Sequence, residues 1–246
     1  MEIYVGRTAR PGTPTQWQFR RRRASGYLLA AYRPYTKWWM TRPRTVRFRG
    51  LRIVVPVGVF PPKLFLSTML VCRTVAGMNL SGRSLLEIGC GSGAVSLVAA
   101  RQGATVTAMD ISPLACQATR ANASANALSV EVIESDLFAN IDGRFDVVVI
   151  TPPYFRHDPT TQLDRAFHAG ANFEYFHRLF DGLGDHLRDD SECLLSLAEG
   201  CDVDIGRIAA GANFELRIHR SCRKALQWTY VFQVRRYDSI GDPARH

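Results

Sequence analysis

Acidic residues are nearly absent from the first quarter of this 246-residue chain. Residues 1–63 hold 14 Lys and Arg but one Asp or Glu, whereas the remainder holds 17 basic and 21 acidic residues. The net charge of +9 therefore arises in the N-terminal part. Such asymmetry favours an acidic partner, and the aromatic residues among the arginines would suit stacking on nucleic acid. The alternative is a solvated basic arm whose tryptophans pack on the main domain.

Long apolar runs and paired metal ligands are also missing. No apolar run of about 18 residues exists, so we expect no membrane-spanning helix. No apolar segment follows the N-terminal charges, so we expect no secretory signal. The six cysteines form no C-x-x-C pair, and the six histidines show no H-x-x-x-H spacing. We therefore expect a cytoplasmic protein with buried thiols and no metal site.

Residues 84–93 carry the most specific pattern, which is a short apolar strand followed by a glycine-rich turn and a helix. Glu87 ends the strand, and Gly89, Gly91 and Gly93 follow. Glycine tolerates positive φ and lets a ligand approach the backbone closely. The spacing G-x-G-x-G differs from the dinucleotide fingerprint G-x-G-x-x-G. An acid before this turn suits a cofactor that carries positive charge, and the pattern resembles the first motif of the Rossmann-like S-adenosylmethionine (SAM) methyltransferases.

Strands and helices alternate from residue 84 to the end of the chain. This alternation predicts an α/β fold with parallel strands and helices on both faces of the sheet. We expect strands at 84–87, 105–109, 129–133, 145–150, 193–197, 215–219 and 228–234, and helices at 94–102, 112–127, 172–187 and 203–212.

The segment upstream of the first core strand has a different character. Alternation at 46–55 indicates a strand or hairpin with one basic face. The Pro- and Gly-rich segment 56–62 cannot be a regular helix or a central strand. We expect it to form a rim over the cofactor, with a plain connector as the alternative. Further upstream, 20–23 is an unbroken basic run and 27–35 is predicted as a helix.

Polar residues follow several of the predicted strands at their carboxyl ends, where ligands gather in open α/β sheets. Asp110 lies about twenty residues after the glycine turn and can accept hydrogen bonds from both ribose hydroxyls of an adenosine. Asp136 can accept a hydrogen bond from an adenine amino group, and its alternative role is that of a turn residue. Together with Glu87, these acids predict one nucleoside-binding crevice.

The sequence Thr151-Pro152-Pro153-Tyr154 is the candidate reaction site. The prolines hold the backbone extended, and carbonyls without ladder partners can accept hydrogen bonds from a substrate amino group. Tyr154 offers a flat face to a planar amide or base. The alternative is a rigid turn with a core aromatic residue.

Residues 56–180 resemble the release-factor glutamine methyltransferases and their small-domain relatives. The matching motifs are Gly58–Pro62 with Ser67–Thr68, Glu87–Gly93, Asp110, Ser135–Phe138, and Ala166–Gly170 with Tyr175–Phe176. One position departs from the family, which has Asn where this chain has Thr151. In the family the Asn oxygen and a proline carbonyl hold the glutamine amide nitrogen, and Thr151 offers a shorter hydroxyl instead.

The resemblance implies a Rossmann-like, seven-stranded, mostly parallel sheet. It divides the chain into a basic N-terminal extension (1–55) and a SAM-dependent methyltransferase domain (56–246). The expected reaction is N-methylation of a protein glutamine amide or a similar planar nitrogen. The alternatives are methylation of an RNA base or a small molecule, and a module that binds SAM without catalysis. The expected acceptor is a release-factor-like protein or RNA, contacted by the basic N-terminal region.

The predicted site falls into three groups. The expected catalytic residues are Thr151, Pro152 and Tyr154. The expected cofactor-binding residues are Glu87, Gly89, Cys90, Gly91, Gly93, Asp110, Ile111, Asp136, Leu137 and Thr151. The expected substrate-binding residues are Phe60, Thr68, Pro153 and Tyr154.

Overall fold

The computed structural model describes most of the chain from residue 41 onward. The described residues are 3–4, 38–39, 41–62, 66–161, 164–198, 203–224 and 227–237. The predicted basic run at 20–23 and the predicted helix at 27–35 lie outside them.

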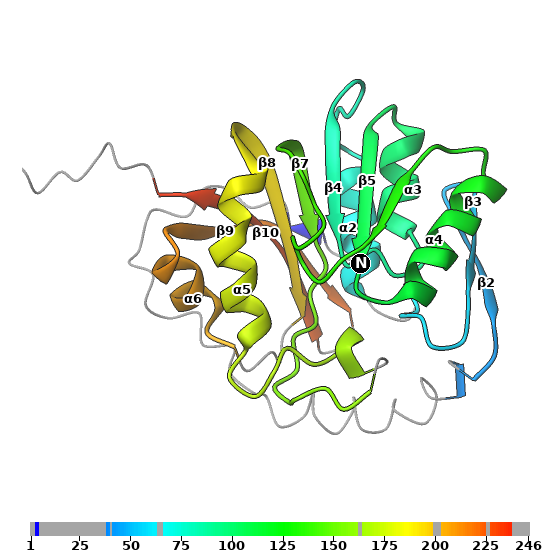
Figure 1. The fold of residues 1–246 in the computed structure, drawn as a ribbon. Coiled ribbons are helices and arrows are strands. Elements are labelled where there is room, and N and C mark those ends of the chain that lie inside the picture. Colours follow the sequence, from blue (N-terminus) through cyan, green and yellow to red (C-terminus); the bar gives the residue numbers. More distant parts are fainter. Residues whose placement is uncertain are drawn as a thin grey trace, which may run out of the picture.

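A central sheet of eight strands has the order β1-β9-β10-β8-β7-β4-β5-β6 (Figure 1). The strands are β1 (Ile3–Tyr4), β4 (Ser84–Ile88), β5 (Thr105–Asp110), β6 (Glu131–Glu134), β7 (Phe145–Ile150), β8 (Leu187–Ala198), β9 (Phe214–Lys224) and β10 (Gln227–Arg236). Strands β6, β5, β4, β7 and β8 are parallel, and β10 runs antiparallel to both of its neighbours. The predicted seven-stranded, mostly parallel sheet is therefore confirmed, and β1 adds a short eighth strand at the edge.

Helices cover both faces of the sheet, as predicted. One face packs against α2 (Leu66–Val75), α3 (Ala94–Arg101) and α4 (Pro113–Ala125), and the other against α5 (Glu174–Leu183) and α6 (Ile205–Gly211). Neighbouring strand residues alternate between these two cores, so that Leu85 belongs to the first and Leu86 to the second. Strands buried on both faces read as nearly continuous apolar runs, which explains the sequence of β7.

The segment before the sheet folds into the predicted hairpin, with β2 (Arg44–Phe48) paired to β3 (Leu51–Val55). Val46, Leu51 and Ile53 are buried in the core that contains α2, α3 and α4. The predicted cap of α4 is also confirmed, because the Ser112 hydroxyl accepts a hydrogen bond from the Ala115 N–H (3.4 Å).

Several element boundaries differ from the prediction, and β9 runs to Lys224, five residues beyond the predicted end at 219. The helix expected over 172–187 ends at Leu183 and is followed by a short 3-10 turn, Gly184–His186. Strand β8 begins at Leu187, six residues before the predicted start at 193. The first half of β8 is polar and mostly exposed, so it lacks the apolar pattern by which a strand is recognised. Among the described residues, no helix is long and apolar enough to cross a membrane.

Candidate active site

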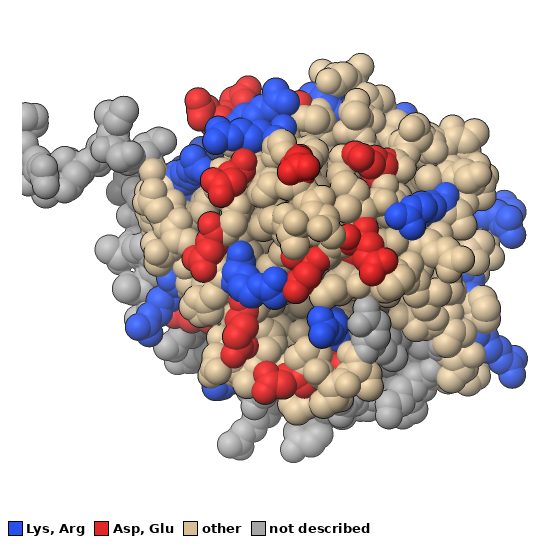
Figure 2. Space-filling view, in the orientation of Figure 1, with Lys and Arg blue, Asp and Glu red and all other residues tan. Residues whose placement is uncertain are grey.

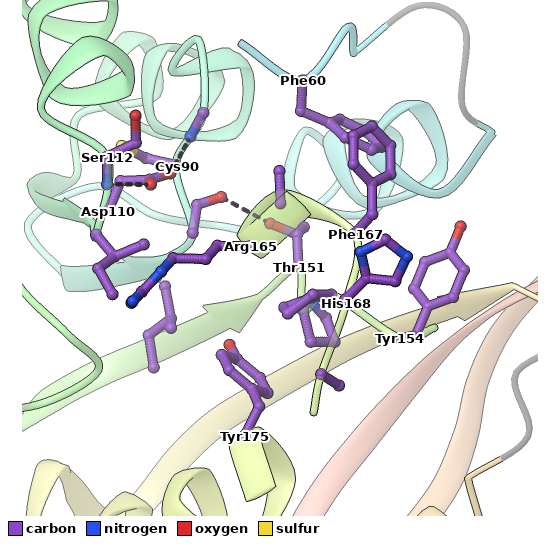
Figure 3. Close-up of a pocket in the computed structure, with 18 of the residues that line it drawn as sticks. Phe60, Cys90, Asp110, Ser112, Thr151, Tyr154, Arg165, Phe167, His168 and Tyr175 are labelled. Carbon is purple, nitrogen blue, oxygen red and sulfur yellow. Dashed lines mark hydrogen bonds between the residues drawn. The ribbon is translucent and has the colours of Figure 1, made fainter. Parts of the chain in front are cut away.

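A cavity of about 520 Å³ opens at the carboxyl ends of β4, β5 and β7 (Figure 3). It brings together residues that lie more than ninety positions apart in the sequence. Its lining contains every predicted site residue except Gly93, namely Phe60, Thr68, Glu87, Gly89, Cys90, Gly91, Asp110, Ile111, Asp136, Leu137, Thr151, Pro152, Pro153 and Tyr154.

The glycine turn forms the floor between β4 and α3. The N–H groups of Gly89 and Cys90 both donate to the Met109 carbonyl (2.9 Å each), which ties the turn to the end of β5. Gly89 has a φ of 79°, and a Cβ at this position would lie 3.1 Å from the Thr151 carbonyl oxygen. A side chain here would therefore press the turn against β7 and narrow the cavity.

Asp110 ends β5 and is held by the backbone on both sides. Its Oδ2 accepts a hydrogen bond from the Gly91 N–H and its Oδ1 from the Ser112 N–H, both at 2.9 Å. Burial raises the pKa of Asp110, and these two hydrogen bonds oppose the rise. Each oxygen keeps a further lone pair, so the carboxylate can accept two more hydrogen bonds from a ligand such as a ribose.

Gly93 stands behind the turn, away from the cavity. It precedes α3 in a left-handed conformation (φ 81°), and a Cβ there would lie 2.9 Å from Cγ2 of Thr119 on α4. The Thr119 hydroxyl in turn donates to the Gly91 carbonyl (3.1 Å) and contacts the Cys90 sulfur (3.4 Å). The missing side chain of Gly93 thus lets α4 brace the turn from behind.

Glu87 is a buried carboxyl group, with 2% of its surface exposed. Its Oε2 accepts hydrogen bonds from the Ser96 N–H (2.8 Å) and the Ser96 hydroxyl on α3. Burial raises the pKa of Glu87 to about 8, although both Ser96 bonds act to lower it. A cation bound beside Glu87 would offset part of this desolvation and favour the ionised form.

Helix α5 contributes two residues that the sequence analysis did not place in the site. The guanidinium of Arg178 forms an ion pair with Asp136 (3.0 Å). Tyr175 points from α5 into the cavity (Figure 3). Its pKa is raised by burial, with a further contribution from the negative charges of Asp110 and Asp136.

Thr151 lies near the middle of the cavity. In Figure 3 it separates Asp110 from Tyr154. Its hydroxyl donates a hydrogen bond to the Gly89 carbonyl (2.9 Å), and its N–H donates to the Ile88 carbonyl (3.2 Å). Because the hydroxyl proton is used within the protein, the lone pairs of this oxygen can face the cavity only as acceptors.

The segment after Thr151 leaves backbone acceptors open. Among the hydrogen bonds of the described residues, none ends on the carbonyl of Pro152 or Pro153. The chain then turns back, and the N–H groups of Tyr154 and Phe155 both donate to the Phe167 carbonyl (3.2 and 2.9 Å). These hydrogen bonds hold the loop that ends near His168 against the candidate reaction site, Thr151–Tyr154, which we call the reaction segment.

Aromatic rings gather on the Tyr154 side of the cavity. The rings of Phe60 and Phe167 lie 5.4 Å apart, and those of Tyr154 and Phe155 lie 4.9 Å apart. Phe60 comes from the segment 56–62, which borders the cavity. Its ring packs beside Phe167, so this rim lies on the Tyr154 side of the cavity, whereas we expected it over the cofactor. We call this half, with Phe60, Tyr154, Phe167 and His168, the acceptor side. We call the half with Glu87, Gly89, Asp110, Asp136 and Tyr175 the cofactor side.

Several lining residues were missed by the sequence analysis: Met109, Ser112, Arg165, Tyr175, Arg178 and Ser196. Met109 and Ser112 flank Asp110, so their place follows from that of the acid. Tyr175 and Arg178 are three residues apart on α5 and share the edge of its apolar stripe. That spacing was available as a signal, whereas nothing in the sequence near Ser196 distinguishes it from other core residues.

A comparison with protein families decides the class of the domain. Residues 51–180 match the family model "Methyltransferase small domain". The chain belongs to this family. The match bears out the predicted family and the methyltransferase class of the domain.

Curated relatives include enzymes with different acceptors. A candidate protein N5-glutamine methyltransferase of Methanocaldococcus jannaschii is 35% identical over 131 residues, which are 53% of this chain and 62% of that protein. The release factor glutamine methyltransferase of Lactococcus lactis is 30% identical over 162 residues, 61% of this chain and 60% of that one. An Escherichia coli ribosomal RNA small subunit methyltransferase C is 39% identical over 121 residues, 48% of this chain and 34% of that one. The chain therefore spans about 60% or less of these relatives.

Solved structures share the fold. The 16S rRNA N2 G1207 methyltransferase of Thermus thermophilus, in complex with AdoMet and guanosine, has a TM-score of 0.54 at 20% identity. The likeness covers 79% of this chain and 50% of that one. It confirms the Rossmann-like methyltransferase architecture.

Proposed function

We propose that this protein transfers the methyl group of SAM to a planar nitrogen held on the acceptor side. One observation carries the proposal, which is that the segment Thr151–Pro153 lines the same cavity as Asp110 and the glycine turn. When bound, SAM supplies a methyl group that its sulfonium has already activated. The protein then has mainly to align the acceptor, and tight positioning is worth roughly 7–11 kcal/mol of barrier.

The cofactor side fits an adenosine with a cationic tail. The spare lone pairs of Asp110 suit the ribose hydroxyls, and Asp136 suits the adenine amino group. Gly89, Cys90 and Gly91 would follow the methionine part of SAM, because no side chain of the two glycines blocks it. Ile111 and Leu137 would contact the adenine ring from either side. Leu137 is buried with a φ of 51°, so its backbone is fixed at this turn.

The acceptor side fits a flat group that carries N–H donors. The Thr151 oxygen and the Pro152 carbonyl would accept hydrogen bonds from the acceptor nitrogen and turn its lone pair toward the methyl group. These acceptors also stabilise the positive charge that develops on the nitrogen. Tyr154 would stack on the acceptor, with Phe60, Thr68 and Pro153 around it.

Two acceptors fit this description. A protein glutamine amide is the acceptor implied by the resemblance and by the name of the Lactococcus lactis relative. The amine of an RNA base is the second candidate, and the aromatic rings of the acceptor side favour it because they can hold a base between them. The name of the Escherichia coli relative supports the same reading.

We further propose that the basic N-terminal extension, residues 1–55, contacts the acceptor while residues 56–246 carry out the transfer. Strand β3 runs directly into the segment that holds Phe60, which would bring the extension beside the acceptor side. Its hairpin packs into the core of the domain, so the proposed division is one of role and not of packing. We propose the cytoplasm as its compartment, which agrees with the five buried free thiols among the described cysteines.

The test is a methyl-transfer assay with purified protein, SAM and two substrates offered separately. One is a glutamine peptide of release-factor type and the other is ribosomal RNA without its native methyl groups. Methylation of either one supports the proposal and selects the acceptor. Binding of S-adenosylhomocysteine (SAH) without transfer to any protein or RNA would contradict it.

A further inference from the structure

Five arginines are exposed on the β2–β3 hairpin, just before β2 and at the neighbouring end of α3. We call this set, Arg42, Arg47, Arg49, Arg52 and Arg101, the arginine face. Figure 2 shows blue side chains and no red ones along the right-hand margin of the molecule, where Figure 1 places β2, β3 and α4. The opposite signs are instead mixed over the middle of the same view.

Among the residues that the structure describes, no acid neutralises this surface. The sequence has no Asp or Glu between Glu2 and Glu87. Helices α3 and α4, which pack against β3, contain none either. In the described part of the chain, none of the five arginines has a carboxylate within ion-pair distance. The arginine face is therefore an uncompensated positive surface.

The arginines occupy positions where the hairpin alone would favour other residues. Arg47 and Arg52 are direct cross-strand partners on the exposed face of the hairpin. Like charges directly opposite each other destabilise a strand pair. Two arginines at this pair of positions thus weaken the hairpin unless an anion lies between them.

The turn of the hairpin also has an arginine at a position that favours other residues. Arg49 and Gly50 both have positive φ, 48° and 82°, as a two-residue hairpin turn requires. The first of these positions favours Asn, Asp or Gly, because a long side chain resists the left-handed conformation. The guanidinium of Arg101 donates to the Arg49 carbonyl and holds the turn in place. Arg49 is thus a third arginine at an unfavourable position, in this case because of its backbone conformation.

The hairpin is fixed rigidly to the domain. On the outer edge of β3, the side-chain amide of Asn122 exchanges two hydrogen bonds with the Val54 backbone (2.8 Å each). One turn further along α4, Asn126 does the same with the Arg52 backbone (2.9 and 2.8 Å). These amides replace a neighbouring strand, so the arginine face keeps a constant position relative to the cavity rim at Phe60.

We propose that the arginine face is a docking surface for single-stranded RNA and delivers it toward the acceptor side. A fixed row of positive charges suits the continuous charge of a phosphate backbone. Trp38, with 53% of its surface exposed, lies at the end of the hairpin, and the Arg44 guanidinium sits 4.6 Å from its ring centre. Aromatic groups beside a positive track are typical of single-strand binding. The delivery step rests on the proposed methyl transfer, but RNA binding does not.

The test is fluorescence anisotropy of a short labelled single-stranded RNA of mixed sequence, titrated with full-length protein at several salt concentrations. The double substitution Arg47→Gln and Arg52→Gln removes two charges. We expect the slope of log affinity against log salt to fall by about 1.4, or about 0.7 for each lost phosphate contact. This corresponds to a roughly 25-fold loss of affinity near 0.1 M salt if the two proteins converge near 1 M.

A matched control removes the same charge elsewhere. Arg144 and Arg207 are exposed and lie outside the hairpin, and Arg207 is on α6 at the other end of the sheet. The pair Arg144→Gln and Arg207→Gln should leave the slope and affinity near those of the original protein. The melting temperature should stay the same or rise for Arg47→Gln with Arg52→Gln, because two opposed charges are gone.

Three results would overturn the proposal. They are no RNA binding by the original protein, equal losses in the two double variants, and competition by polyglutamate as strong as that by unlabelled RNA of equal charge. The last result would assign the surface to an acidic protein. SAH affinity, measured separately by calorimetry, should be unchanged in both variants. If the original protein does not bind SAH, the proposed function is contradicted, but the proposed RNA-docking surface is not.

Discussion

The cofactor side and the acceptor side of the cavity are built from different kinds of structure. The cofactor side consists of strand ends and a glycine turn, with Gly91 and Ser112 fixing Asp110 through backbone N–H groups. The acceptor side consists of loops, the rim 56–62 and the stretch up to His168, which fold over the reaction segment and carry aromatic rings. Thr151 begins the reaction segment, and its hydroxyl donates a hydrogen bond to the Gly89 carbonyl on the cofactor side.

This contrast suggests a division of labour. Backbone donors and buried carboxyl groups recognise a constant ligand, because their geometry is set by the sheet. Loops can vary without disturbing the sheet, so they suit an acceptor that differs among relatives. Substitutions on the cofactor side should therefore change SAH affinity, and substitutions on the acceptor side should change turnover.

The largest expected effect concerns the buried carboxyl group of Glu87. The folded protein keeps this proton up to about pH 8, whereas an unperturbed Glu releases it near 4.5. The folded state thus binds more protons in this range, and the contribution of Glu87 to the free energy of unfolding falls as the pH rises through it. The size should be of the order of a few kcal/mol, since each pKa unit corresponds to about 1.4 kcal/mol.

Urea unfolding of the ligand-free protein across this pH range measures the effect. The substitution Glu87→Gln should flatten the pH profile relative to the original protein. The control Asp136→Asn, at a partly exposed and ion-paired residue, should leave the profile unchanged. Parallel profiles for Glu87→Gln and the original protein would show that Glu87 does not carry the buried proton.

The next effect tests the cofactor side by ligand binding. Asp110→Asn should weaken SAH binding by about 1.5–3 kcal/mol, because charge-assisted hydrogen bonds to the ribose are lost. Asp136→Asn should cost less, since Arg178 already shares this carboxylate and both side chains are about half exposed. Calorimetry gives both values. Equal affinity of Asp110→Asn and the original protein for SAH would show that Asp110 does not bind the ribose.

A smaller effect is expected on the acceptor side. Tyr154→Ala should lower turnover roughly tenfold, because stacking of a base on an aromatic ring is worth about 1–3 kcal/mol. Tyr154→Phe keeps the ring and should stay close to the original rate. SAH affinity should not change in either variant. A loss of SAH affinity equal to the loss of turnover would break the division between the two sides.

The smallest effect is expected at Thr151, where the two sides meet. Thr151→Val keeps the shape and removes the hydroxyl, which should lower turnover about fivefold for a neutral hydrogen bond worth about 1 kcal/mol. Thr151→Ser retains the hydroxyl and should act as the matched control. Thr151→Asn restores the family motif and should increase methylation of a glutamine peptide if Thr151 alone limits it. Unchanged turnover for Thr151→Val would show that the Thr151 hydroxyl has only a structural role, through its hydrogen bond to Gly89.

The residues predicted for the cofactor side, except Gly93, line one cavity, and the signals that pointed to them are local. A glycine turn after a strand, an acid at the end of the next strand and the Ser112 cap all lie within a few residues of the structure they determine. The spacing alone did not distinguish Gly93 from Gly89. Gly89 lines the cavity, whereas Gly93 faces Thr119. This difference depends on the packing of α4, which lies further along the chain.

The acceptor side could be predicted only in part. The reaction segment and the rim were found from their prolines, but the pairing of Tyr154 with Phe167 joins residues across a loop without periodic pattern. The sequence predicted α5 as a helix, but the reach of Tyr175 into the cavity depends on how the buried face of this helix packs on the sheet.

The polar first half of β8 gave no strand signal, and its register against β7 is irregular between Leu187 and Glu192. The Ser191 hydroxyl supports this stretch, because it accepts a hydrogen bond from the Arg188 N–H and donates one to the Phe145 carbonyl.

The most direct test of methyl transfer uses SAM labelled in its methyl group. The protein is incubated with a cell extract, and the products are divided by protease and ribonuclease digestion. The account predicts label in one macromolecular fraction, with much less label for Tyr154→Ala at unchanged SAH affinity. Tight SAH binding by the original protein with no label in protein or RNA would contradict the account.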